Sequence, residues 1–211
     1  GITEKDIIAT WAGVRPIVSE RNTDGKRKKP SKENREHVIW SDNGLISIAG
    51  GKLTTFRLIA REVLTRAQDL IPELTLREND APVFSPPEAR ARPEGIGHRT
   101  WERLEGFYGP ALEHVLDAGA HTAIAGTDTL WAELAWAATN TSVVHLDDLL
   151  LRRTRLGLIL PSGGKALLPE IRKLCQPKLG WDDDTWNGEQ ARYLGIWRAS
   201  YSLPANGDKA T

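Results

Sequence analysis

Hydrophobic and polar positions follow two different patterns along the chain, and a proline-rich stretch separates them. Before residue 72, β-branched residues stand in short runs between turn signals, whereas apolar residues after residue 97 recur at helical spacing. The stretch between them contains five prolines, which interrupt regular elements: Pro72, Pro82, Pro86, Pro87 and Pro93. We therefore predict a first domain over residues 1–75, a linker over 76–97, a helical domain over 98–205 and a disordered tail over 206–211.

Four short runs in the first part have the composition of β-strands: Asp6–Trp11, Val14–Val18, His37–Ser41 and Leu45–Ala49. The last two are joined by Asp42-Asn43-Gly44. Because Asn and Gly tolerate the positive φ that a tight turn requires, this connection predicts a β-hairpin.

A helix is predicted directly after the hairpin. Gly50 and Gly51 end the second strand, and Lys52-Leu53-Thr54-Thr55 leads into apolar residues at helical intervals. These residues are Leu58, Ile59, Val63, Ala67 and Leu70.

The second part contains four apolar stripes at helical spacing, and we predict that they form the core of a helical domain. The stripes are Trp101, Leu104, Tyr108, Leu112, Val115 and Leu116; Trp131, Leu134, Ala135 and Ala138; Leu146, Leu149, Leu150 and Leu156; and Trp186, Gln190, Tyr193 and Trp197. Asp182, Asp183 and Asp184 precede the last stripe, where negative charge favours a helix N-terminus. Six of the 8 Trp residues lie beyond position 100, so we expect large rings to fill this core.

The composition excludes several classes of protein. Lys and Arg number 28, and Asp and Glu also number 28, so the chain lacks the basic excess of a nucleic-acid-binding domain. Cys175 is the single cysteine, which excludes an internal disulfide and fits a reducing compartment. No apolar run approaches the roughly 20 residues that cross a bilayer. The absence of methionine fits either a removed initiator residue before Gly1 or a truncated chain.

Few catalytic patterns are present. The chain has no Gly-x-Ser-x-Gly, and its histidines form no His-x-x-x-His pair, so we predict neither a serine hydrolase nor a metal site. Gly50-Gly51-Lys52 is not a P-loop, because Ile46 occupies the position of the motif's first glycine.

One arrangement is compatible with ligand binding. Gly50 and Gly51 at a helix start would let an anion or a polarised carbonyl approach backbone N–H groups, and Lys52 would add a full charge. Arg15 is a second cation, between Gly13 and Pro16. The residues alone leave two interpretations open, a binding site or a helix cap beside ordinary solvated cations.

These same residues resemble FAD-dependent glycerol-3-phosphate dehydrogenase, specifically its carboxy-terminal part. Three segments carry the resemblance in the first part: Trp11-Ala12-Gly13-Val14-Arg15-Pro16, Arg35-Glu36-His37 and Gly50-Gly51-Lys52-Leu53-Thr54-Thr55-Phe56-Arg57. Four more carry it in the second: Arg103-Leu104, Tyr108-Gly109, Asp147-Asp148-Leu149 and Arg152-Arg153-Thr154-Arg155-Leu156-Gly157. The family's dinucleotide-binding motif is absent, so the chain looks like a carboxy-terminal fragment.

The resemblance implies an α+β fragment, in which N-terminal strands, a β-hairpin and one helix come from an FAD-dependent oxidoreductase core and a mostly α-helical C-terminal domain follows. The family oxidises sn-glycerol 3-phosphate to dihydroxyacetone phosphate, with hydride transfer to FAD and electrons passing to quinone. Carried over to this chain, the substrate-binding residues are Arg15, Lys52 and Arg35. The cofactor-binding residues are Gly50, Gly51, Lys52, Leu53 and Thr54.

The resemblance also implies a cytoplasmic protein peripheral to the inner membrane, no nucleic-acid partner, and a homodimer as an assembly to test. Because the family's remaining active-site groups lie upstream, we expect the fragment alone neither to retain FAD nor to oxidise glycerol 3-phosphate. Two alternatives stay open: a related FAD-dependent amine or hydroxy-acid oxidase, and a helical module for dimerisation or partner docking.

Overall fold

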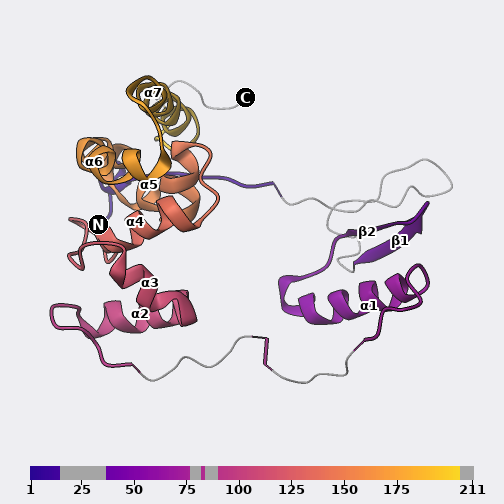
Figure 1. Ribbon diagram of the computed structural model, residues 1–211. Coiled ribbons are helices and arrows are strands. Elements are labelled where there is room, and N and C mark those ends of the chain that lie inside the picture. The colour runs from indigo at the N-terminus through magenta and orange to yellow at the C-terminus, as the bar shows by residue number, and fades with distance from the viewer. Residues whose placement is uncertain (15–36, 77–81, 84–89, 205–211) are drawn as a thin grey trace. The chain divides into compact units, whose positions relative to one another are not determined.

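The computed structural model describes residues 1–14, 37–76, 82–83 and 90–204 (Figure 1). The chain divides into two compact units. One unit is Gly13–Pro82, and the other combines Gly1–Ala12 with Val83–Thr211. We call them the hairpin–helix unit and the helical unit.

The hairpin–helix unit contains strands β1 (Val38–Asp42) and β2 (Leu45–Ala49), which pair antiparallel with Val38 opposite Ala49. Asn43 and Gly44 form the turn with φ of 48° and 80°. The predicted hairpin is therefore confirmed, and the reason is the left-handed backbone that Asn and Gly accept.

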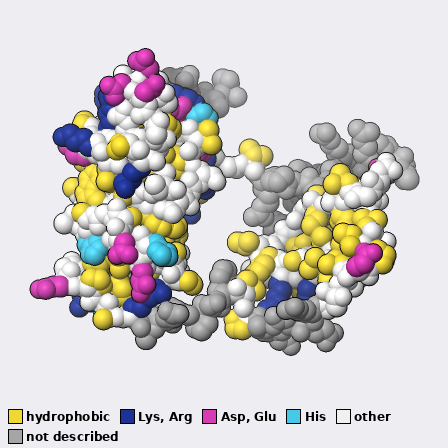
Figure 2. Space-filling view, in the orientation of Figure 1, with side chains coloured by type: hydrophobic (Ala, Val, Ile, Leu, Met, Phe, Trp, Pro, Cys, Tyr) yellow, Lys and Arg dark blue, Asp and Glu magenta, His cyan; other side chains and the backbone are white. Residues whose placement is uncertain are grey.

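The predicted helix after the hairpin is also confirmed. A short 3₁₀ turn, η3 (Leu53–Thr55), leads directly into α1 (Phe56–Gln68). No residue of β1, β2 or α1 is fully buried. Figure 2 shows hydrophobic side chains gathered on the visible face of this unit.

The predicted strand over Asp6–Trp11 is wrong. Residues 4–6 form a 3₁₀ turn, η1 (Glu4–Asp6), in which the backbone N–H and hydroxyl of Thr3 donate to the Asp6 carboxylate at 2.7 and 2.8 Å. Among the described residues the only sheet is the β1–β2 pair, so the segment has no ladder partner there. The second predicted strand, Val14–Val18, lies almost entirely outside the described residues.

The first residues instead contact the end of the helical unit. The backbone N–H of Thr10 donates to the carbonyl of Tyr201 at 2.8 Å, and its hydroxyl donates to the carbonyl of Ser202 at 3.0 Å. Ala9 packs against the helical core. Residues 1–12 therefore group with the helical unit, which differs from the predicted boundary at residue 75.

The helical unit confirms a mostly helical second part. Its elements are α2 (His98–Tyr108), η4 (Gly109–Ala111), α3 (Leu112–Asp117), α4 (Trp131–Asn140), a π-helical turn η5 (Asp148–Arg153), α5 (Leu156–Ile159), η6 (Pro161–Leu167), α6 (Leu168–Leu179) and α7 (Asp183–Ser200). Asp182 caps α7 by accepting a hydrogen bond from the backbone N–H of Thr185 at 2.8 Å.

Two predicted stripes turn out to span two elements each. The stripe from Trp101 to Leu116 is divided at Gly109, where α2 ends with φ 48°. The stripe from Leu146 to Leu156 is divided at Arg155, which has φ 58°. At both positions a residue with positive φ ends the helical geometry, although the apolar spacing continues in the sequence.

Two apolar clusters form the core of the helical unit. The larger one surrounds the fully buried Trp186 and Tyr193, and the smaller one contains Trp101, Leu104 and Leu112. The prediction that large rings fill this core is confirmed. No helix in the described ranges combines the length and apolar character needed to cross a membrane.

Candidate functional site

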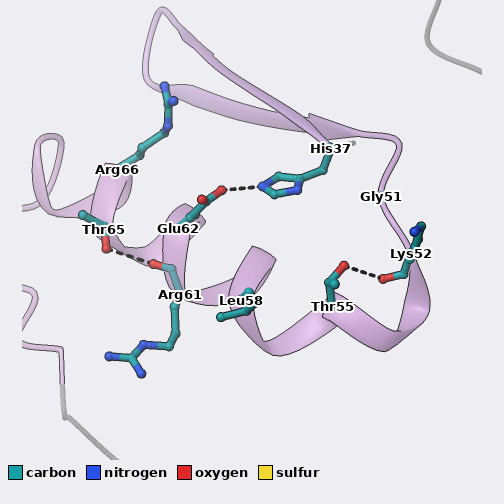
Figure 3. A pocket seen from close by; sticks show the side chains of 9 residues that line it. All are labelled: His37, Gly51, Lys52, Thr55, Leu58, Arg61, Glu62, Thr65 and Arg66. Carbon is teal, nitrogen blue, oxygen red and sulfur yellow. Dashed lines mark hydrogen bonds and ion pairs between the residues drawn. The ribbon is translucent and has the colours of Figure 1, made fainter. Parts of the chain in front are cut away.

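An open pocket of about 830 Å³ lies in the hairpin–helix unit, between the start of β1, the glycine turn and one face of α1 (Figure 3). Its lining residues are His37, Gly51, Lys52, Thr55, Leu58, Arg61, Glu62, Thr65 and Arg66.

The double glycine is needed for both conformation and space. Gly50 and Gly51 have φ of 79° and 86°, a region that L side chains rarely adopt. A Cβ added at Gly51 would lie 2.7 Å from the Cδ1 of Ile59 and 3.2 Å from the Cβ of His37. The loop therefore packs closely against both the start of the hairpin and α1, and Lys52 follows at its exit.

The helix start offers backbone donors. The backbone N–H and the hydroxyl of Thr55 both donate to the carbonyl of Lys52 at 3.0 Å. No acceptor among the described residues takes a hydrogen bond from the N–H groups of Leu53 and Thr54. Two such amides beside a lysine are suited to bind a negatively charged or polarised oxygen.

The charges of the pocket are mainly positive. Lys52, Arg61 and Arg66 contribute three cations, whereas Glu62 contributes one acid, whose carboxylate pairs with the His37 ring. Figure 3 shows Arg66 reaching toward the hairpin and Arg61 extending away from it. The charge balance favours an anionic ligand.

The structure brings together part of the predicted site. Gly51 and Lys52 line the pocket, and Gly50, Leu53 and Thr54 belong to the same loop. Arg15 and Arg35 lie outside the described residues. The other lining residues are not among the site residues predicted from the sequence. Of these, His37 could have been predicted from the hairpin register. A residue just before β1 lies beside the end of β2, where the glycine turn begins.

The motif residues of the helical unit form partly buried ion pairs that join its helices. Arg103 donates to both carboxylate oxygens of Glu133 at 2.8 and 2.6 Å, and the Tyr108 hydroxyl donates to Glu133 at 2.9 Å. Burial, together with the neighbouring Glu133 charge, raises the pKa of Tyr108. These groups therefore stabilise the packing of α2 against α4.

Metal and thiol chemistry find no support in the described part of the chain. No group of three or more His, Cys, Asp or Glu side chains there could hold a metal ion. Burial raises the pKa of the Cys175 thiol to about 12, so the thiolate that a nucleophile requires is scarce at neutral pH.

The family is established by comparison with known proteins. The model of the C-terminal domain of alpha-glycerophosphate oxidase matches residues 46–186, which is more than half of the chain. This chain belongs to that family of C-terminal domains.

Curated relatives agree with the family. Glycerol-3-phosphate dehydrogenase 1 of Mycobacterium tuberculosis is 32% identical over 74% of this chain and 31% of its own length. Glycerol-3-phosphate dehydrogenase 2 of the same species is 28% identical over 98% of this chain and 38% of its own length. The aerobic glycerol-3-phosphate dehydrogenase of Bacillus subtilis is 39% identical over 46% of this chain and 16% of its own length.

The chain spans about a third of the length of the first two relatives. No solved structure shows a significant match to it.

Proposed function

We propose that this chain is the C-terminal part of a flavoenzyme that oxidises sn-glycerol 3-phosphate to dihydroxyacetone phosphate, with FAD as hydride acceptor and quinone as electron acceptor. The family and the names of the relatives support the substrate. The observation that carries the proposal is the pair of amides at Leu53 and Thr54 beside Lys52, for which the described residues provide no acceptor.

We propose that the loop from Gly50 to Thr54 contacts the flavin. FAD would accept a hydride from the substrate alcohol, and negative charge would then develop on the ring. The amides of Leu53 and Thr54 would donate to an oxygen of that ring, and Lys52 would stabilise its charge. Gly50 and Gly51 would let the backbone approach the ring closely.

The substrate would be held by cations. Lys52 would lie beside its phosphate or its reacting end. Arg15 and Arg35 remain proposed substrate contacts, because a guanidinium forks two hydrogen bonds onto a phosphate. We further propose that the enzyme is a homodimer attached to the cytoplasmic surface of the inner membrane. There it could pass electrons to a quinone in the membrane.

The test begins with the coding sequence upstream of Gly1, which we expect to contain a Gly-x-Gly-x-x-Gly motif. The protein encoded with that sequence should carry a flavin absorption band and reduce a quinone analogue when glycerol 3-phosphate is added. The 211-residue chain alone should be colourless and inactive. A preference of the longer protein for amines or hydroxy acids would favour the related oxidase instead.

Lys52→Ala in the longer protein should lower turnover on the order of 100-fold, the usual effect of removing one group that stabilises developing charge. Flavin content should remain. Lys165→Ala is the matched control, since Lys165 is exposed in the helical unit far along the sequence from the pocket. Equal turnover of Lys52→Ala and the unsubstituted enzyme would refute the role of Lys52.

A further inference from the structure

His37 lies where the hairpin, the glycine turn and α1 meet. It directly precedes β1, and the pairing of Val38 with Ala49 brings it beside the end of β2. Gly51 fits between the Cβ of His37 and the Cδ1 of Ile59 on α1. The turn is therefore enclosed by His37 on one side and by Ile59 of α1 on the other.

The His37 ring also reaches α1 directly. It forms a hydrogen bond with the carboxylate of Glu62, in the second turn of that helix (Figure 3). The side chains of His37 and Glu62 are 23% and 59% exposed.

The position of α1 constrains the N–H groups of η3, the turn that directly precedes it. η3 and α1 are continuous, so the amides of Leu53 and Thr54 turn with the helix axis. Contacts to a reacting ring must be held to within about 0.5 Å to be effective. The hydrogen bond between His37, just before β1, and Glu62, in the second turn of α1, would provide that constraint.

We propose that His37 and Glu62 are a positioning pair, which fixes α1 against the hairpin so that the amides of Leu53 and Thr54 and the side chain of Lys52 meet the ligand in one orientation. This inference rests on the proposed function for the identity of the ligand. Neither side chain has to touch the flavin or the substrate, because the pair acts through the glycine turn.

Hydrogen exchange on the 211-residue chain tests the positioning pair without any flavin. In His37→Ala and in Glu62→Ala, the hydrogen-bonded amides of residues 55–60 should exchange about three to ten times faster, the effect of losing one partly exposed charged hydrogen bond. The double variant should exchange no faster than either single variant, because both remove the same contact.

Two further variants sharpen the test. Glu62→Gln keeps an acceptor for the His37 ring and should restore most of the protection. Thr65→Ala is the matched control on the same pocket face, since its hydroxyl donates only to the Arg61 carbonyl of its own helix. Unchanged exchange in both single variants, or effects that add fully in the double variant, would overturn the pair.

Turnover of the longer flavoprotein separates this inference from the proposed function. His37→Ala should lower kcat while leaving KM for glycerol 3-phosphate nearly unchanged, and Glu62→Gln should recover kcat. If Lys52→Ala leaves turnover unchanged, the proposed function fails whatever the exchange data show. If exchange is unchanged in His37→Ala and Glu62→Ala, the positioning pair fails whatever Lys52→Ala does.

Discussion

At the scale of single residues, Asp147 shows how the helical unit tolerates a buried charge. Asp147 is 2% exposed, and its carboxylate accepts hydrogen bonds from the guanidinium groups of Arg152 and Arg192. Burial alone would raise the pKa of Asp147, but the two arginines outweigh it and hold the pKa below its ordinary value. A buried charge that keeps its partners is tolerated, whereas one that loses them is costly.

Asp147 predicts that the helical unit loses stability in acid. Because the folded pKa lies below the unfolded value of about 3.9, the stabilising effect is complete above that value and is lost as the pH falls through the folded pKa. Asp147→Asn should lower the free energy of unfolding at pH 7 by about 1–3 kcal/mol. It should also flatten the decline below pH 5.

Urea unfolding followed by Trp fluorescence at several pH values measures both quantities. Asp117→Asn is the control, because Asp117 is exposed at the end of α3 and should change stability by no more than about 0.5 kcal/mol. An acid decline as steep in Asp147→Asn as in the unsubstituted chain would show that other groups cause it.

At the scale of elements, left-handed backbone shapes the connection from η5 to α6. Arg155 has φ 58°, and residues 162–164 have three consecutive positive φ values. α7 packs against this connection, and the Tyr193 hydroxyl donates to the Gly163 carbonyl at 2.6 Å. A Cβ on Gly163 would lie 2.7 Å from the Cδ1 of Trp197. Arg155 and Gly163 therefore share a positive φ but differ in their surroundings. Arg155 is exposed, whereas Gly163 is buried against α7.

That difference predicts opposite effects of substitution. Arg155→Gly should raise the free energy of unfolding by about 0.5–1 kcal/mol, because Arg155 is exposed and glycine removes the left-handed strain. Gly163→Ala should lower it by about 2–4 kcal/mol, because strain and a clash with Trp197 add. Thermal unfolding followed by circular dichroism measures both, and a stable Gly163→Ala would show that α7 can move away.

At the scale of the whole molecule, the two units differ in how much they bury. The helical unit contains fully buried residues from α2 to α7, including Leu104, Leu134 and Trp186. In β1, β2 and α1 of the hairpin–helix unit no residue is buried. Since burial of apolar area is the main stabilising term, the described part of this unit has far less stabilisation of its own.

We therefore predict that the two units unfold separately. Amides of residues 38–68 should exchange at low urea, whereas those of α4, α6 and α7 should exchange only on unfolding of the helical unit. Cys175 provides an independent probe, because its buried thiol should react with a disulfide reagent only when the helical unit opens. A single transition shared by all amides would contradict this prediction.

The sequence by itself determined the local elements and the family. Asn43-Gly44 specified the hairpin, Gly50-Gly51 the turn before α1, and Asp182 the start of α7, because each depends on backbone preference or on a contact within a few residues. The Gly50–Thr54 loop was predicted for the same reason.

Only the tertiary structure decided which distant residues meet. Asp6–Trp11 has strand-like composition, yet Thr10 forms hydrogen bonds with Tyr201 and Ser202, nearly 200 residues away. These partners follow a helix and belong to no described strand. His37 and Glu62 stand 25 positions apart, and no periodicity joins them. Their contact depends on how α1 packs on the hairpin, which is a property of three-dimensional packing and leaves no mark in the local pattern of residues.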